Sequence, residues 1–252
     1  MARRRRRPVQ EGSAAKALDE IESAGDRIVL WLGEYQRSIL IVAAGILVLA
    51  GGWGYVSGSR ETASSAADTA LSEVQQGYRL AMGADPGGID IPEPANVEAA
   101  REIRQDFSAR YEAVAEAHAG TGPGAVAYLE AGKLRQALGE TEAAVSAYEA
   151  GIASLPADDA LRGFLWSRLG SVYEQDAQWP SAAIAYGNAG STPNYAIRGD
   201  AMASAIRAYI HAGEPSAALS VADELARAES DYVLPGSLQA QIDELRSAAA
   251  LD

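Results

Sequence analysis

The sequence has no cysteine and only two histidines among its 252 residues. Without cysteine the chain cannot form a disulfide, attack a substrate with a thiol or hold a metal through thiolates. The histidines, His118 and His211, are far apart in the sequence, and neither lies in an HExxH motif. GxSxG motifs and glycine-rich phosphate loops are also missing. We therefore expect no enzymatic activity, no metal and no cofactor.

Basic residues are scarce in the C-terminal three quarters of the chain. Residues 60–252 hold 13 Lys or Arg against 28 Asp or Glu, a net charge of −15, whereas residues 1–37 hold eight against six, a net charge of +2. A domain this acidic does not bind nucleic acid through its phosphates, and anionic lipid repels it. Abundant alanine and few β-branched residues favour packed helices over a sheet.

One long uncharged run interrupts the polar sequence. Residues 38–59 contain no charged side chain, and as a helix they would extend about 33 Å, enough to cross a hydrocarbon core of ~30 Å. The run is longer than the apolar centre of a cleaved signal, so we predict a retained membrane anchor. The arginines at positions 3–7 resist translocation and predict a cytoplasmic N-terminus with the C-terminal domain on the other side of the membrane.

Within the predicted anchor, Ala50, Gly54 and Gly58 follow a small-xxx-small spacing. This spacing can let two helices approach closely, either in a homo-oligomer or against a membrane partner, although chance matches are common in glycine-rich spans. Residues 1–37 are interpreted as a cytoplasmic basic tail with a juxtamembrane helix. Residues 60–124 are interpreted as a long helix and a helical lead-in, with helical patterns at 61–83 and 97–119 and breaks at 84–94 and 120–124.

Residues 125–252 predict three repeats and a C-terminal capping helix at 237–251. The repeats begin at residues 125, 163 and 199, which are 38 and 36 residues apart. Each has a turn residue expected in a left-handed conformation and then a small residue where two antiparallel helices touch. The turn residues are Gly139, Ala177 and Gly213, and the small residues are Ala144, Ala182 and Ala218. Tyr148 and Tyr186 follow to fill the groove between helices, whereas the third repeat has Ala222 there and reads as degenerate.

These spacings resemble tetratricopeptide repeats, although the intervals are slightly longer than the usual 34 residues. The whole layout is similar to the YfgM-like ancillary subunits of the SecYEG translocon. The resemblance implies a single-pass protein of the bacterial inner membrane, whose all-α solenoid stands in the periplasm and binds secreted chains or periplasmic chaperones beside translocon subunits. The alternative is a static scaffold subunit of a cell-wall or division complex, with no chaperone role.

In tetratricopeptide domains the first helix of each pair lines the concave face, and this rule selects a candidate protein-binding groove. Mapped onto this chain, the groove consists of Leu129, Lys133, Gln136, Phe164, Ser167, Ser171, Glu174, Ala203, Arg207 and Ile210. Phe164 between serines suits an extended peptide, and Lys133 and Arg207 could hold its carboxylates. The alternative is that these residues only solvate the groove, or pack against the chain's own long N-terminal helix.

Overall fold

The computed structural model describes residues 63–85 and 90–250, all of which belong to a compact unit spanning Arg60–Asp252. The predicted tail at 1–37, the anchor at 38–59 and its small-residue spacing at Ala50, Gly54 and Gly58 lie outside the described residues. Among the helices that are described, none combines the length and the apolar character needed to span a bilayer.

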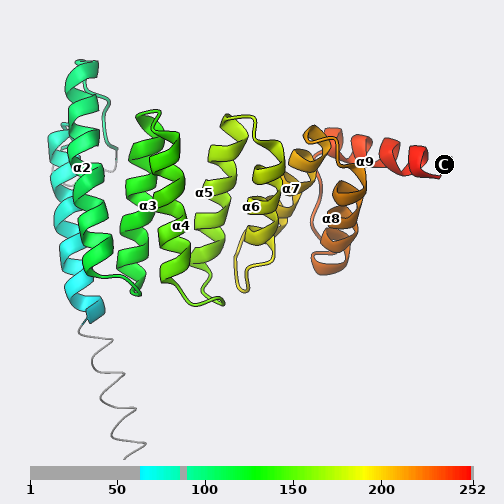
Figure 1. Ribbon diagram of the computed structural model, residues 1–252, viewed down its shortest axis with the longest axis horizontal. Coiled ribbons are helices and arrows are strands. Elements are labelled where there is room, and N and C mark those ends of the chain that lie inside the picture. Colours follow the sequence, from blue (N-terminus) through cyan, green and yellow to red (C-terminus); the bar gives the residue numbers. More distant parts are fainter. Residues whose placement is uncertain (1–62, 86–89, 251–252) are drawn as a thin grey trace, which may run out of the picture. The chain divides into compact units, whose positions relative to one another are not determined.

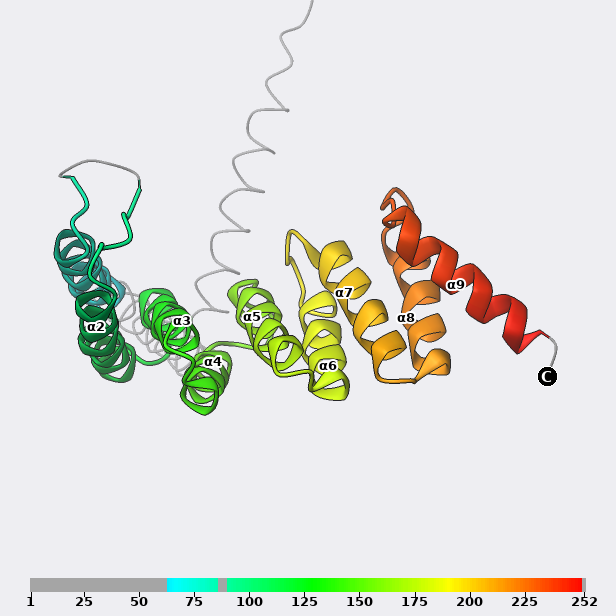
Figure 2. The same cartoon turned by 90° about the horizontal axis from the view of Figure 1, so that it is seen from above.

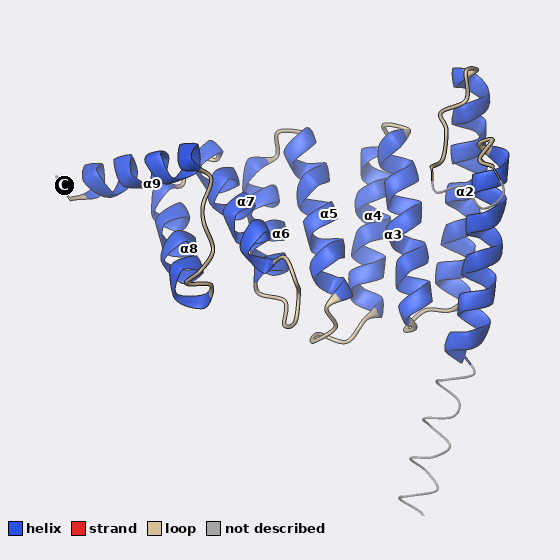
Figure 3. Ribbon diagram, turned by 180° about the vertical axis from the view of Figure 1, so that it is seen from behind, coloured by secondary structure: helices blue, strands red, loops and turns tan. Residues whose placement is uncertain are grey.

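The described part of the chain contains helices and no strands, which confirms the predicted all-α class (Figure 3). It starts with a helix at residues 63–81. The helices that follow are α2 (Val97–Ala117), α3 (Gly122–Ala137), α4 (Thr141–Ser154), α5 (Leu161–Gln175), α6 (Trp179–Gly190), α7 (Arg198–His211), α8 (Pro215–Ala228) and α9 (Gly236–Ala249). The break predicted at 120–124 is shorter than expected, because Thr121 caps α3 through its side chain and Pro123 fits the first turn.

Each helix packs mainly on its neighbours in the chain, so the helices follow one another in order (Figure 1). Two further contacts skip one helix: α3 touches α5, and α5 touches α7. Viewed from above, α3 and α5 lie on one side and α4 and α6 on the other (Figure 2). We call α3, α5 and α7 the first-helix row, since each is the first helix of a pair.

The three turns inside the pairs have the predicted left-handed residue. The φ angles are +75° at Gly139, +53° at Ala177 and +73° at Gly213. In each turn the N–H of the next residue donates to a carbonyl five positions earlier, the bond of a Schellman motif. The middle turn therefore keeps its shape with an alanine, at a steric cost of roughly 1 kcal/mol.

The contact between the two helices of a pair is built from one large and one small residue. Ala144, Ala182 and Ala218 are fully buried, as predicted. In the first pair, a Cβ on Gly132 would lie 2.5 Å from the ring of Tyr148, and in the second, one on Gly170 would lie 2.8 Å from the ring of Tyr186. Each glycine therefore makes the room that its tyrosine occupies.

The third pair reverses this arrangement. Ile206 stands where the other pairs have glycine, and Ala222 stands where they have tyrosine. Both residues are buried in the same core cluster. The repeat that reads as degenerate is thus also closed by one large and one small buried residue, with the large side chain on the first helix instead of the second.

The lead-in and the cap continue the same core at either end. Leu71 of the helix at 63–81 and Phe107 and Tyr111 of α2 share a cluster with Ala127, Ala131 and Leu134 of α3. At the other end, Leu238 and Ile242 of α9 are buried against residues of α7 and α8, and most of the remaining α9 side chains are exposed. The predicted capping helix is therefore present, beginning at Gly236.

Candidate protein-binding surface

The residues of the predicted groove fall on the first-helix row. Leu129, Lys133 and Gln136 are on α3, the four from Phe164 to Glu174 are on α5, and Ala203, Arg207 and Ile210 are on α7. One of them does not line an open surface, because Ala203 is only 7% exposed and belongs to the core. The others are partly or fully accessible.

Two polar bridges join successive helices of this row. The Gln136 amide donates to Gln175 Oε1 over 2.9 Å and links α3 to α5. The Arg207 guanidinium donates to both oxygens of Glu174 over 3.0 and 3.1 Å and links α7 to α5. Gln175 was missed by the groove prediction, since its partner on α3 is 39 positions away in the sequence.

The tyrosines that fill the pairs also position these bridging groups. Tyr186 donates to Glu174 Oε2 over 2.7 Å, and Tyr148 makes a longer contact of 3.4 Å with Gln136 Oε1. Burial and the nearby Glu174 carboxylate raise the pKa of Tyr186, so this hydroxyl keeps its proton and remains a donor. The hydroxyls of the two buried tyrosines therefore orient Glu174 and Gln136 on the first-helix row.

Both cations of the predicted groove are paired within the chain. Lys133 Nζ lies 3.0 and 2.9 Å from the two oxygens of Glu130, and Arg207 bonds to Glu174. The prediction assigned these cations to a partner's carboxylates. A partner carboxylate would have to displace Glu130 or Glu174, and partly exposed pairs of this kind are worth only ~0–1 kcal/mol.

The two groove serines are likewise engaged by tyrosines. Ser167 Oγ is 3.0 Å from the hydroxyl of Tyr195, and Ser171 lies beside the hydroxyl of Tyr186. The ring of Tyr195 also packs edge-on against Phe164, with centroids 4.9 Å apart, and covers Gly163, where a Cβ would meet it at 2.4 Å. Phe164 is thus held in place while 42% of it remains exposed.

A second concave feature lies beside the row and was not predicted. A cavity of about 570 Å³ opens between the helix at 63–81, α2 and α3. Its floor includes Met82, Tyr111 and Leu134, all at most 6% exposed, and Lys133 lies on its wall. A sequence signal for it existed, because Glu130, Lys133, Leu134 and Ala137 recur at helical spacing on one face of α3.

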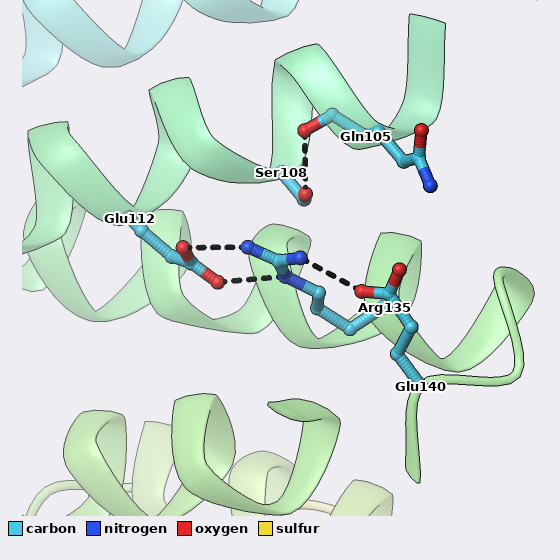
Figure 4. Close-up of polar contacts among 5 residues, drawn as sticks. All are labelled: Gln105, Ser108, Glu112, Arg135 and Glu140. Carbon is cyan, nitrogen blue, oxygen red and sulfur yellow. Dashed lines mark hydrogen bonds and ion pairs between the residues drawn. The ribbon is translucent and has the colours of Figure 1, made fainter. Parts of the chain in front are cut away.

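A partly buried ionic cluster joins α2 to α3 (Figure 4). Arg135 of α3 donates two bonds of 2.9 Å to the carboxylate of Glu112 on α2 and one of 2.7 Å to Glu140, which precedes α4. The three side chains are 21–31% exposed, and the two acids raise the pKa of Arg135. Beside them, the buried Ser108 hydroxyl donates to the carbonyl of Gln105 over 2.9 Å.

No family model, curated protein or solved structure matches the chain.

The surface must therefore be interpreted from its own chemistry. His211 stacks on Trp179, with ring centroids 4.4 Å apart and planes inclined by 23°. Among the described residues, no group of three or more His, Asp or Glu is arranged to hold a metal ion. The first-helix row presents the ring of Phe164, the amides of Gln136 and Gln175, the ion pairs of Lys133 and Arg207, and the exposed Arg168.

Proposed function

We propose that residues 122–249 are a tetratricopeptide-type solenoid that binds polypeptides along the first-helix row, without a catalytic step. Three repeated features support this assignment. The turns at Gly139, Ala177 and Gly213 share one hydrogen-bond pattern, successive first helices touch, and each pair is closed by one large and one small residue.

The single observation that carries the binding function is the state of Phe164. Its ring is 42% exposed, yet Tyr195 fixes its position and Ser167 in turn fixes Tyr195. A side chain that is already ordered loses little entropy when a partner covers it. Exposed aromatic anchors of this kind are common at the centres of protein interfaces.

The polar groups further along the first-helix row, towards the C-terminal end of α5, suit a peptide backbone better than a charged small molecule. The amides of Gln136 and Gln175 can donate and accept, as a backbone does. The nearby cations are neutralised by Glu130 and Glu174. Arg168 is a further cation on the row, and residues 60–252 as a whole carry a net charge of −15, which does not attract an anion.

For the cellular setting, we propose a single-pass bacterial inner-membrane protein with its repeats in the periplasm. The uncharged run at 38–59 supports an anchor, and the arginines at 3–7 support a cytoplasmic N-terminus. Combined with a peptide-binding row, this placement suits an accessory of the secretion translocon that contacts emerging chains or periplasmic chaperones.

Photo-crosslinking of the full-length protein in cells tests the proposal. A benzophenone side chain at Phe164 should capture newly secreted, unfolded chains. The same side chain at Ile184, which is 57% exposed on α6 outside the first-helix row, is the matched control and should capture few. Equal capture at both positions would contradict binding along the row. Capture of one folded envelope protein in fixed stoichiometry would instead favour the scaffold function.

A further inference from the structure

The cavity beside α3 has the size and the floor of a binding pocket for an apolar group. Its volume of about 570 Å³ lies within the range of ~300–1,000 Å³ typical of ligand pockets. Met82 and Leu134 form an apolar floor at 3% and 6% exposure, and Ala137 lines the wall at the end of α3. A leucine or phenylalanine side chain and a short stretch of its backbone would fit.

The hydroxyl of Tyr111 points to what accompanies the apolar group. Four other buried or half-buried tyrosines each reach a side chain: Tyr148 reaches Gln136, Tyr186 reaches Glu174, Tyr195 reaches Ser167 and Tyr232 reaches Asp200. Tyr111 is only 3% exposed and lines the cavity, but its hydroxyl hydrogen-bonds to none of the described residues. The oxygen is not among the fully buried atoms that lack a partner, so it opens into the cavity and can donate to an acceptor of a ligand there.

Four of the five charged side chains at the cavity occur as pairs of opposite sign. Arg104 contacts Glu93, and Lys133 contacts Glu130. The fifth charged side chain, Arg79, gives the wall one more cation than anions. Over residues 60–252 as a whole the net charge is −15, which repels a free anion such as a phosphate or a fatty-acid carboxylate at long range. A neutral or basic polypeptide is not repelled in this way.

From these three features we propose that the cavity receives an apolar anchor residue of the bound polypeptide. The inference rests on the proposed function and extends it N-terminally beyond the repeats. The anchor side chain lies on Met82 and Leu134, and the Tyr111 hydroxyl donates to a backbone carbonyl of the same segment. Lys133 belongs both to the cavity wall and to the first-helix row, so one continuous chain can occupy the two.

The test uses the full-length protein in nanodiscs of zwitterionic lipid and short rhodamine-labelled peptides that differ only in one central residue. Fluorescence anisotropy should show that the leucine and phenylalanine peptides bind at least about tenfold more tightly than the serine peptide. Ala137→Trp fills the cavity and should abolish that preference. The matched control is Ala153→Trp, which places the same side chain on an exposed position of α4 and should bind as the wild type does.

Tyr111→Phe gives a readout that a merely structural role would not. It should weaken binding of the leucine peptide about three- to tenfold, while thermal stability stays the same or rises, because an unpartnered hydroxyl has been removed. Weakened binding with a matching loss of stability would contradict the assignment of the hydroxyl to the ligand.

The remaining outcomes separate the cavity from the row. If Ala137→Trp binds the leucine peptide as the wild type does while Phe164→Ser loses it, the cavity inference fails and the proposed function stands. If no peptide binds the wild type, both fail. Octanoate is the probe for a free amphiphile. If it binds the wild type but not Ala137→Trp, and the leucine peptide does not bind, the inference is overturned.

Discussion

The ring of Tyr148 occupies the space that a side chain on Gly132 would need: its Cε1 lies 2.5 Å from the position of a Cβ there. Gly170 and Tyr186 repeat this relationship in the second pair. In the third pair Ile206 and Ala222 fill the equivalent positions with the sizes exchanged. Each pair thus has one large and one small side chain between its two helices. The large one belongs to the second helix in the first two pairs and to the first helix in the third.

Exchanging the sizes in the first pair should therefore be tolerated only when both residues change. Gly132→Ile alone should destabilise the protein by about 3 kcal/mol through overpacking, and Tyr148→Ala alone by about 3–5 kcal/mol through a cavity. The double variant should lose at least about 1 kcal/mol less than the sum, as judged by urea unfolding. Strict additivity of the two losses would show that the residues do not share one space.

The left-handed turn at Ala177 offers a stabilising substitution. Ala177→Gly should raise the free energy of unfolding by about 0.5–1 kcal/mol, because φ is +53° there and glycine adopts that conformation without strain. The reciprocal control, Gly139→Ala at φ +75°, should lower it by about 1 kcal/mol. Chemical denaturation measures both, and the prediction is wrong if the two changes have the same sign.

Removing Arg135 should loosen α2 from α3. Arg135→Met leaves the partly buried Glu112 and Glu140 without their cation, and we expect a loss of about 1–2 kcal/mol in unfolding free energy. Arg246→Met breaks an exposed pair with Asp223 on the last two helices and should cost less than about 0.5 kcal/mol. Thermal melts of the two variants compare the sites directly. Similar losses would show that the Arg135 cluster contributes no more to stability than an exposed ion pair does.

Alkaline pH should destabilise the protein through its buried tyrosines. Burial raises the pKa of Tyr148 from 10.0 to about 12. The unfolded chain therefore loses this proton at a lower pH than the folded protein, and stability falls as the pH rises from about 10 to 12. At pH 11 the loss is about 1.4 kcal/mol for this one group.

Absorbance of the phenolate near the ultraviolet edge, recorded with melting temperature across that pH range, checks this prediction. Tyr148→Phe retains the ring and removes the titrating proton, so its stability should fall less steeply than that of the wild type. An identical pH dependence in wild type and variant would assign the effect to other tyrosines, such as Tyr232, whose pKa is also raised to about 12.

The sequence predicted those features that depend on residues close together in the chain. The turns at Gly139, Ala177 and Gly213 and the buried alanines that follow them depend on spacings of a few residues, and the structure confirms them. The anchor and its orientation remain predictions, since they concern residues outside the described part.

Features that depend on distant residues could not be predicted in the same way. The compensation of Ala222 by Ile206 requires knowing which positions of two helices face each other. The sequence places Ser167 and Ser171 in the groove, but nothing near them in the sequence indicates that Tyr195 and Tyr186 lie against them. The cavity depends on how residues 63–81 pack against α3, more than 40 positions further along the chain.

The exchanged sizes of Ile206 and Ala222 restrict how such an array can grow or shrink by duplication. A duplication or loss that takes a complete helix pair preserves the fit of each first helix to its second helix. A recombination between the two helices of a pair would set glycine against alanine and leave a void, or isoleucine against tyrosine and create a clash. The heritable unit of this domain is therefore the pair and not the single helix.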